Sequence, residues 1–377
     1  MKISISFEEM QRTMGYINTL FDKSVDEKMK NVIFLVDSEG VTVVGHSPFT
    51  FSRVHLSEVE MQDIDPNIPW NFQVKASDIN KILSSYTSLS KTKADTIIFE
   101  ENDSRIRATV HEVPLKEEDS RLEQYSHYQL DRKNILQTIL DTVLESFPSE
   151  TDSIMSEDLG LYLGCLSGVM DSSGTATSKL NFADDYVFVI NSHMSSFMVN
   201  RLPDAFRGIT LNSSSISFLN KMVNSSECLS VAREGSYLCV SSENIESFMR
   251  YQKQSINYKA YLKDDTSLGI VLDRAYLKDV LKRMGSVSPE GKASCEDDCL
   301  YLVNEAFEQN IPLENSRGNV SDVCFSISVP ILEKSVISDV SDKVFIYFIP
   351  SARGYFVKIT DASGIWFSVT QVVKTNL

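Results

Sequence analysis

Apolar positions recur at helical spacing in residues 270–287. They stand at i, i+3, i+4 and i+7, which is the stripe of a helix with one buried face. The apolar positions are Leu277, Val280, Leu281 and Met284. Asp273 precedes the stripe, where its carboxylate can accept a hydrogen bond from the first turn, so it is predicted to cap the helix.

The opposite face of this predicted helix is basic. Arg274, Lys278 and Lys282 lie four residues apart, where like charges repel by roughly a few tenths of a kcal/mol per pair. Two interpretations are open at this stage: a solvated lysine face, or a surface that approaches an anion.

The same order of elements is predicted three times along the chain. An alternating strand leads into an amphipathic helix, β-rich runs follow, and a strand, a second helix and a hairpin complete the unit. The first helices are predicted at residues 7–23, 131–147 and 273–284, and the second helices at 77–93, 213–224 and 329–342. In the second unit, residues 159–169 are predicted to be a strand.

Two helices and several strands in each unit indicate an α+β fold, with the helices packed on antiparallel sheets. The predicted domains are residues 1–124, 125–257 and 258–377. Because the units match in order and hydrophobic period, not in residue identity, three unrelated α+β domains remain the alternative.

Charge is distributed unevenly between the predicted helices and the rest of the chain. The 377 residues include 52 acidic and 36 basic side chains, a net charge of −16, which argues against a surface that binds nucleic acid everywhere. The six predicted helices together carry almost no net charge, so the negative charge lies outside them. This distribution suits a protein that approaches a polyanion with its helices.

Six cysteines are too sparse in so long a chain for a disulfide scaffold. The N-terminus carries no secretion signal and no apolar run approaches the roughly 18 residues of a membrane span, so we expect free thiols in a cytoplasmic protein. Cys295 and Cys299 bracket three acidic residues, but their spacing is unlike that of zinc sites. No metal and no cofactor are predicted.

The chain resembles the ring-shaped DNA sliding clamps of the bacterial type, the beta subunit of DNA polymerase III and its phage relatives. The resemblance rests on the order of elements over the full length, on the opening through residues 1–14 and 31–45, and on Ile190-Asn191-Ser192-His193, where the family commonly has Thr-Asp-Gly-His. It implies a homodimer, joined head to tail into a ring with helices lining the hole. Such a processivity factor encircles double-stranded DNA without base specificity and tethers the replicative polymerase, at the nucleoid or in the cytoplasm of an infected cell.

On this resemblance, basic residues on the inner helices contact phosphates without base readout. The candidate DNA-binding residues are Arg12, Lys23, Lys81, Lys91, Arg132, Lys133, Lys221, Arg274, Lys278, Lys282, Arg283 and Lys334. For any single lysine, a solvated surface charge is an equal alternative.

The resemblance also implies a pocket between the second and third domains, where the polymerase and the clamp loader insert short hydrophobic peptides. The pocket residues would be Leu163, Ile190, Ser192, His193 and Val373. Ser192 replaces the family's glycine and Ser195 its leucine, so a pocket for a different peptide, or for no peptide, is an open alternative. For the dimer contact, the candidate edges are the strand Arg105 to Val110 and the last hairpin.

Two other classes of function compete with a clamp. The chain is predicted not to be an enzyme, because its five histidines are scattered and no P-loop, HExxH, GxSxG or dinucleotide-binding turn occurs. A non-enzymatic structural or interaction protein of repeated β-rich domains, such as a viral assembly component, is the remaining alternative. It would not stay on DNA, whereas a clamp stays on a closed circle and slides off a linear end.

Overall fold

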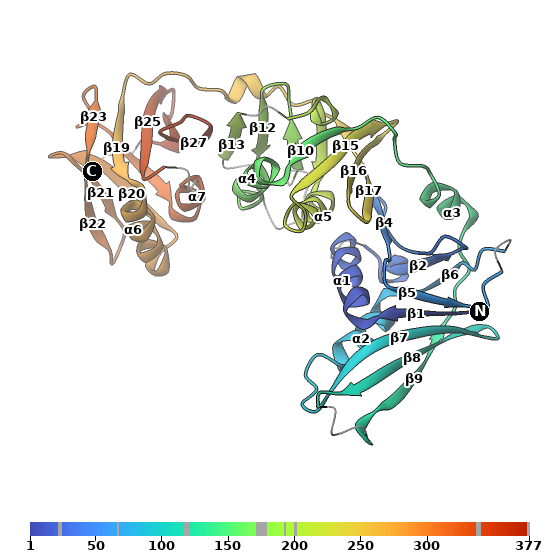
Figure 1. Ribbon diagram of the computed structural model, residues 1–377. Helices are drawn as coiled ribbons and strands as arrows, with labels where there is room; N and C mark the ends of the chain where they lie inside the picture. Colours follow the sequence, from blue (N-terminus) through green and yellow to red (C-terminus); the bar gives the residue numbers. More distant parts are fainter. Residues whose placement is uncertain are drawn as a thin grey trace. The chain divides into compact units, whose positions relative to one another are not determined.

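The computed structural model describes residues 1–21, 25–65, 68–116, 121–170, 179–191, 194–199, 202–336 and 341–374. The chain forms two compact units, one of Met1–Glu157 with Ser214–Tyr251 and one of Asp158–Ser213 with Gln252–Leu377 (Figure 1). They are called unit 1 and unit 2.

Unit 1 contains two antiparallel sheets. Their strands are β1 (Lys2–Ser6), β2 (Asn31–Val36), β3 (Val41–His46), β4 (Thr50–His55), β5 (Val59–Gln62), β6 (Phe72–Lys75), β7 (Thr92–Asn102), β8 (Arg105–Pro114), β9 (Gln124–Asp131), β10 (Asp152–Met155), β15 (Cys228–Glu234), β16 (Tyr237–Ser242) and β17 (Ile245–Arg250). The strand orders are β5-β1-β7-β8-β9 and β10-β15-β16-β17-β4-β3-β2-β6. The helices of this unit are α1 (Phe7–Ile17), α2 (Ala76–Ser85), α3 (Gln137–Val143) and nearly all of α5 (Ser213–Val223).

Unit 2 also contains two antiparallel sheets. Their strands are β11 (Lys179–Phe182), β12 (Tyr186–Ile190), β13 (Met194–Val199), β14 (Ile209–Asn212), β18 (Gln252–Lys253), β19 (Gly269–Asp273), β20 (Glu290–Glu296), β21 (Cys299–Val303), β22 (Glu308–Pro312), β23 (Asn315–Arg317), β24 (Cys324–Ser328), β25 (Lys343–Ser351), β26 (Gly354–Asp361) and β27 (Trp366–Val373). The strand orders are β18-β14-β11-β12-β13-β27-β26-β25-β19-β23 and β22-β21-β20-β24. The helices are most of α4 (Ser156–Ser167), α6 (Arg274–Val287) and α7 (Val329–Ser335).

The helix predicted from the stripe at residues 270–287 is confirmed as α6. Its four stripe residues are completely buried: Leu277, Val280, Leu281 and Met284. The Asp273 carboxylate accepts a hydrogen bond from the backbone N–H of Tyr276 at 2.7 Å, so the predicted cap is also confirmed. Burial of the stripe fixes which face of α6 is left for solvent or a ligand.

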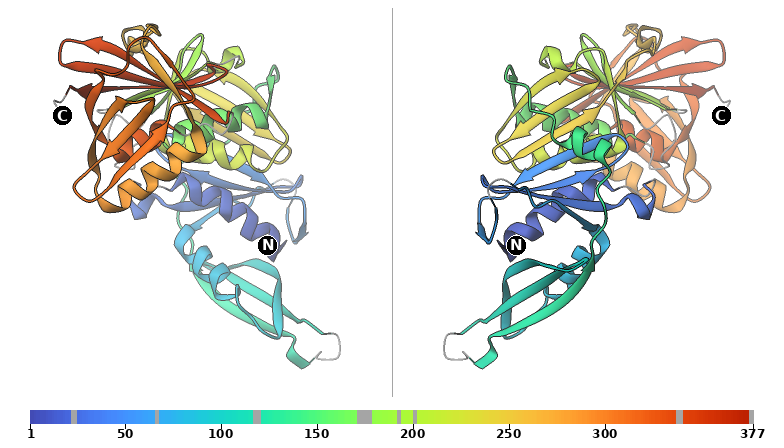
Figure 2. Two further views of the ribbon diagram at one scale, coloured as in Figure 1. Left: turned by 90° about the vertical axis from the view of Figure 1, so that its left-hand side faces the viewer. Right: turned by 90° about the vertical axis from the view of Figure 1, so that its right-hand side faces the viewer.

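The second repeat opens later in the chain than the hydrophobic pattern predicts. Residues 131–147 hold only the short helix α3, and β9 before it pairs with β8 (Figure 2). Ile139 and Leu140 of α3 pack with Phe51 and Phe248 on a sheet face of unit 1. The prediction that residues 131–147 form the opening helix of the second unit is therefore wrong.

The strand predicted at residues 159–169 is also wrong, because most of these residues belong to α4. Leu159, Leu163 and Leu166 are completely buried at i, i+4 and i+7, while Leu161 is exposed. Leucines at alternate positions suit a strand and a helix equally over so short a stretch. With this correction, the opening pairs of the three repeats are β1-α1, β10-α4 and β19-α6, and the second helices are α2, α5 and α7.

Neither strand predicted as a dimer edge lies at an edge. β8, which contains Arg105 to Val110, lies between β7 and β9, and the last hairpin lies inside the 10-stranded sheet of unit 2. β8 is covered by β9, the next strand in the chain, and the last hairpin, β25 with β26, is flanked by β27 on one side and by β19 on the other. Both predictions are therefore wrong.

Candidate nucleic-acid interface

The exposed face of α6 is the most basic helix surface in the described chain. Lys282 and Arg283 are exposed, and Arg274 and Lys278 are partly exposed. Asp279 is the acidic residue of this helix, and its backbone carbonyl accepts a hydrogen bond from Arg283 Nε at 3.4 Å. α6 packs beside α7, which adds the exposed Lys334. These side chains form a cationic surface that can take phosphates without base contacts.

The basic residues on α1 and α2 each have an acidic neighbour one turn away. Arg12 lies 3.8 Å from Glu9, and Lys81 lies 3.7 Å from Asp78. The Lys81–Asp78 pair is largely exposed, and such pairs contribute about 0–1 kcal/mol, so Lys81 can exchange its carboxylate for a phosphate at little cost. Arg12 is exposed, but the Glu9 side chain is only 2% exposed, and its carboxylate also accepts hydrogen bonds from the backbone N–H groups of Ser57 and Glu58.

Side-chain contacts join α1 to both of its neighbouring helices in unit 1. The amides of Asn18 and Asn80 exchange two hydrogen bonds, of 3.0 and 2.9 Å, at the end of α1 and on α2. On the other side, the Lys221 ammonium of α5 lies 5.6 Å from the Tyr16 ring centroid of α1. The three helices thus form one connected surface that carries Arg12, Lys81 and Lys221.

Two of the predicted DNA-binding residues lie outside the helices and form an ion pair or hydrogen bonds with other parts of unit 1. Arg132 pairs with Glu101 at 2.5 Å and donates to the Asn71 carbonyl at 3.2 Å, while Lys133 Nζ donates to Asn31 Oδ1 at 2.8 Å. Their placement on an inner helix is therefore wrong. These bonds hold the segment after β9 against the sheets of unit 1.

The remaining candidates are not equivalent in position. Lys91 is exposed in the turn before β7. Lys23, Ser192 and His193 lie outside the described residues.

The predicted peptide-pocket residues that are described differ in exposure. Leu163 is completely buried in α4, and Ile190 is half-buried beside an aromatic cluster on the sheet of unit 2. Val373 is 60% exposed at the end of β27, where it lines a groove of about 950 Å³ together with residues of β20, β24, β26 and α7. Only Val373 of these three offers an open apolar surface.

Each unit contains one junction at which strands far apart in sequence pair across repeats. In unit 1, β17 pairs with β4 and sets Ser247 opposite Ser52. The adjacent Phe248 and Phe51 stack with ring centroids 4.5 Å apart. Their antiparallel pairing makes one continuous sheet from two repeats.

The junction in unit 2 repeats this arrangement. There β27 pairs with β13, and Ser368 lies opposite Ser196, with a hydroxyl–hydroxyl distance of 3.1 Å. Phe367 and Phe197 stack at 5.0 Å beside this pair. Both junctions therefore combine a serine pair on one face of the sheet with an aromatic stack on the other.

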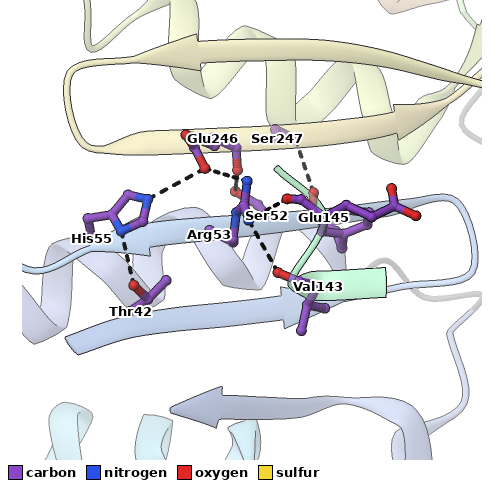
Figure 3. Close-up of polar contacts among 9 residues, drawn as sticks. Thr42, Ser52, Arg53, His55, Val143, Glu145, Glu246 and Ser247 are labelled. Carbon is purple, nitrogen blue, oxygen red and sulfur yellow. Dashed lines mark hydrogen bonds and ion pairs between the residues drawn. The ribbon is translucent and has the colours of Figure 1, made fainter. Parts of the chain in front are cut away.

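Arg53 binds both strands of the unit 1 junction and the segment after α3 that links the two repeats (Figure 3). Its guanidinium lies 2.5 Å from the Glu246 carboxylate and 4.9 Å from the Phe248 ring centroid. It also donates to the backbone carbonyls of Val143 at 3.3 Å and Glu145 at 2.7 Å. A single cation therefore joins β4, β17 and the segment after α3.

His55 approaches the same carboxylate from the exposed side. Its Nε2 lies 3.5 Å from Glu246, and its Nδ1 lies 3.0 Å from the Thr42 hydroxyl (Figure 3). The hydrogen bond with His55 and the charge of Arg53 hold the pKa of Glu246 below its usual value. Glu246 is therefore a carboxylate throughout the neutral range.

Lys358 has the corresponding role at the unit 2 junction. Its ammonium lies 4.6 Å from the Phe367 ring centroid, donates to the Lys263 carbonyl at 2.7 Å and lies 3.8 Å from Asp264. Burial lowers the pKa of Lys358. At both junctions a cation therefore ties an aromatic ring to the segment that links the two repeats.

Sequence analysis missed these junctions. A lone arginine inside an apolar strand, as in Thr50–His55, is the available signal, because a charge at such a position needs a partner. The partner Glu246 lies far along the chain, so local patterns do not reveal it.

The described residues offer few other candidates for a redox or metal site. The six cysteines are free thiols. Within the described ranges, no group of His, Cys, Asp and Glu side chains is arranged to hold a metal ion, and no helix is long and apolar enough to cross a membrane.

Comparison with known proteins identifies the fold. No protein-family model matches the sequence, and no curated protein matches it. Many solved structures match, and bacterial DNA polymerase III beta sliding clamps are among those that match over the full chain. The DNA polymerase sliding clamp of Bacillus subtilis has a TM-score of 0.79 at 10% identity, with 100% of both chains covered.

Two further structures show the same likeness. The beta subunit of DNA polymerase III from Thermotoga maritima has a TM-score of 0.76 at 11% identity, and the beta subunit of the Streptococcus pyogenes DNA polymerase has 0.74 at 15%, each with 100% of both chains covered. The chain thus has the fold of the DNA polymerase III beta sliding clamps, and the α+β class with tandem clamp-like repeats is confirmed.

Proposed function

We propose that this chain is a DNA sliding clamp, a non-enzymatic processivity factor that encircles double-stranded DNA and tethers the replicative polymerase. The observation that carries the proposal is the full-length likeness to the beta clamps of bacterial DNA polymerases. The basic face of α6 in a chain of net charge −16 supports it independently.

Electrostatics explains why such a surface suits sliding. A ring is held on DNA by its closed topology, so its phosphate contacts need only be weak and exchangeable. Arg12 and Lys81 each pair with a carboxylate on their own helix, and α6 supplies the strongest local positive charge. An acidic exterior keeps DNA from binding outside the hole.

The partners of the proposed clamp are duplex DNA, a second copy of the chain, and short hydrophobic peptides of the polymerase and the clamp loader. The peptide site would use the groove wall at Val373 together with Leu163, Ile190, Ser192 and His193. Three domains, at residues 1–124, 125–257 and 258–377, and action in the cytoplasm belong to the same proposal.

Retention on DNA of different topology tests the function. The chain is loaded on nicked circular DNA with a clamp loader of the host replication system, passed through a sizing column, and then challenged with a restriction enzyme that linearises the circle. A clamp remains with the circle and is lost after linearisation. Equal retention on circular and linear DNA, or none on either, contradicts the proposal.

A further inference from the structure

The first helices of the three repeats can be compared residue by residue, because their buried faces match. α1, α4 and α6 each bury their fourth, eighth and eleventh residues to 1% exposure or less. These residues are Met10, Met14 and Ile17 in α1, Leu159, Leu163 and Leu166 in α4, and Leu277, Leu281 and Met284 in α6. Residues at the same position of each helix therefore point to corresponding sides.

The basic line of α6 has no counterpart on the exposed faces of α1 and α4. The ninth residue is Lys282 in α6 but Gly15 in α1 and Gly164 in α4, and all three are exposed. The fifth residue is Lys278 in α6, Gln11 in α1 and Gly160 in α4. Where α6 presents two ammonium groups, α1 therefore presents an amide and a glycine, and α4 presents two glycines.

Packing does not require either of the exposed glycines at the ninth position. A Cβ added to Gly15 or Gly164 would meet nothing within 4 Å beyond its own helix backbone and its two neighbours in the chain. Both residues lie inside a helix, where glycine is less favourable than alanine because more backbone freedom is lost on folding. Alanine would therefore fit and stabilise both helices, so the reason for glycine is to be sought on the exposed side.

Charge separates the three helices in the same way. α6 contains four basic residues and one acidic residue, α1 contains one basic and two acidic, and α4 contains two acidic and no basic. Arg12, the basic residue of α1, lies beside Glu9, and in α4 its position is taken by Leu161, which is 40% exposed. The second helices α2, α5 and α7 contain one lysine each, so they do not distinguish the repeats.

We propose that, of the three first helices, α6 alone holds the phosphates of the duplex, while α1 and α4 face the DNA without binding it. The inference deepens the proposed function and rests on it for the presence of DNA beside these helices. Phosphate binding needs local positive potential, and each omitted cation removes one exchangeable contact. Glycine at the ninth position leaves no side chain to reach toward the duplex. The first two repeats thus limit the number of phosphates held at one time, and the third repeat supplies the attraction.

Photo-crosslinking from the three helices tests which of them the duplex contacts. Gly15→Cys, Gly164→Cys and Ser286→Cys are made singly in a Cys228→Ser, Cys299→Ser background, because the other four thiols are buried. Each new cysteine replaces an uncharged, exposed residue and carries an azidophenacyl label. The labelled chains are loaded on nicked circular DNA and illuminated. We expect the label on α6 to give about fivefold more protein–DNA adduct, or a greater excess, than either of the others.

Retention on the circle, measured for the parent and for each labelled chain, separates this inference from the proposed function. Adduct formed mainly by Ser286→Cys supports the inference. Equal adduct from all three labels, or more from Gly15→Cys or Gly164→Cys, overturns it and leaves the clamp function intact. A parent chain that is not retained on circular DNA overturns both.

Neutralising one cation on each helix supplies a second test that needs no label. Lys282→Gln is expected to flatten the slope of the logarithm of the DNA-binding constant against the logarithm of the salt concentration by about 0.9, because one phosphate contact is lost. Arg12→Gln, the matched change on α1, is expected to leave that slope unchanged. Equal flattening by the two changes contradicts the inference, and so does an unchanged slope for Lys282→Gln.

Filling the glycine positions tests the alternative that DNA packs closely against the helix backbone. Gly15→Ala with Gly164→Ala is expected to raise the melting temperature and to leave the DNA-binding constant within about twofold of the parent value. Lys282→Ala, the same replacement at the ninth position of α6, is expected to weaken binding by more than this. A larger loss of binding in the glycine variant than in Lys282→Ala would place the closest DNA contact on α1 or α4, and the inference would fail.

Discussion

Replacing Arg53 with methionine isolates the junction between β4 and β17. The change keeps an unbranched apolar side chain and removes the guanidinium that joins Glu246 to the Val143 and Glu145 carbonyls. The Arg53 side chain is only 10% exposed and that of Glu246 25%, so the carboxylate would lose its arginine partner in a largely buried place and keep only the contact with His55. Removing one partner of a buried pair costs about 3–5 kcal/mol.

Urea denaturation followed by tryptophan fluorescence measures this loss. The chain has 2 tryptophans, Trp70 in unit 1 and Trp366 in unit 2, so a Trp366→Phe background makes the signal report on unit 1. In that background, Arg53→Met is expected to lower the free energy of unfolding by about 3–5 kcal/mol. Adding Glu246→Gln is expected to recover about 1–3 kcal/mol as coupling between the two residues.

Arg233→Met provides the matched control. Arg233 is an exposed arginine whose guanidinium lies 5.2 Å from the Tyr251 ring centroid in the same unit, and an exposed cation–π contact contributes about 0.5–1 kcal/mol. If Arg53→Met costs no more than this control, or if its effect and that of Glu246→Gln simply add, the account of the junction is refuted.

Three further predictions follow from the helices and from Glu246. Lys278→Glu with Lys282→Glu is expected to weaken DNA binding. The slope of the logarithm of the DNA-binding constant against the logarithm of the salt concentration is expected to flatten by about 2, because each lost phosphate contact lowers that slope by about 0.9. Lys253→Glu, at an exposed strand residue, is expected to leave the slope unchanged. Leu277→Ala removes a completely buried side chain of α6 and is expected to cost about 2–5 kcal/mol in urea unfolding, and a loss below 1 kcal/mol would contradict its core position. Glu246 has a pKa below its ordinary 4.5 in the folded chain, so the stability it contributes is complete above about pH 4.5 and is lost as pH falls through the lowered pKa. The unfolding free energies of the parent and of Glu246→Gln are therefore expected to converge below about pH 4.5. A difference that stays constant with pH would exclude the ion pair as the source of the stability.

Local periodicity was enough to predict the elements whose burial follows from their own sequence. α6 was predicted because its stripe and its cap both lie within the helix. α4 was not, because Leu159, Leu161 and Leu163 satisfy strand and helix spacing alike, and the packing of Leu166 decides between them. The family resemblance was correct about the fold because the order of elements tolerates such local errors.

Contacts between distant strands set the features that could not be predicted. Arg132 was assigned to a DNA-facing helix because apolar spacing predicted a helix over residues 131–147, although Glu101 and the Asn71 carbonyl hold it on the sheets. The junction of β4 with β17 likewise joins residues such as Ser52 and Glu246, which are 194 positions apart. A hydrophobic pattern specifies which face of a strand is buried, but not which strand lies beside it.

The ion pair at the unit 1 junction also bears on how the chain avoids misassembly while it folds. β4 and β13 hold the same place in their repeats, as do β17 and β27, so β17 and β27 each meet two similar pairing partners. The native choice sets Arg53 opposite Glu246 and Phe197 opposite Phe367. Exchanging the partners would set Arg53 against Phe367 and Glu246 against Phe197, leaving each charge without its counterpart. One buried pair of charges thus favours the native pairing of β17 with β4 over its pairing with β13.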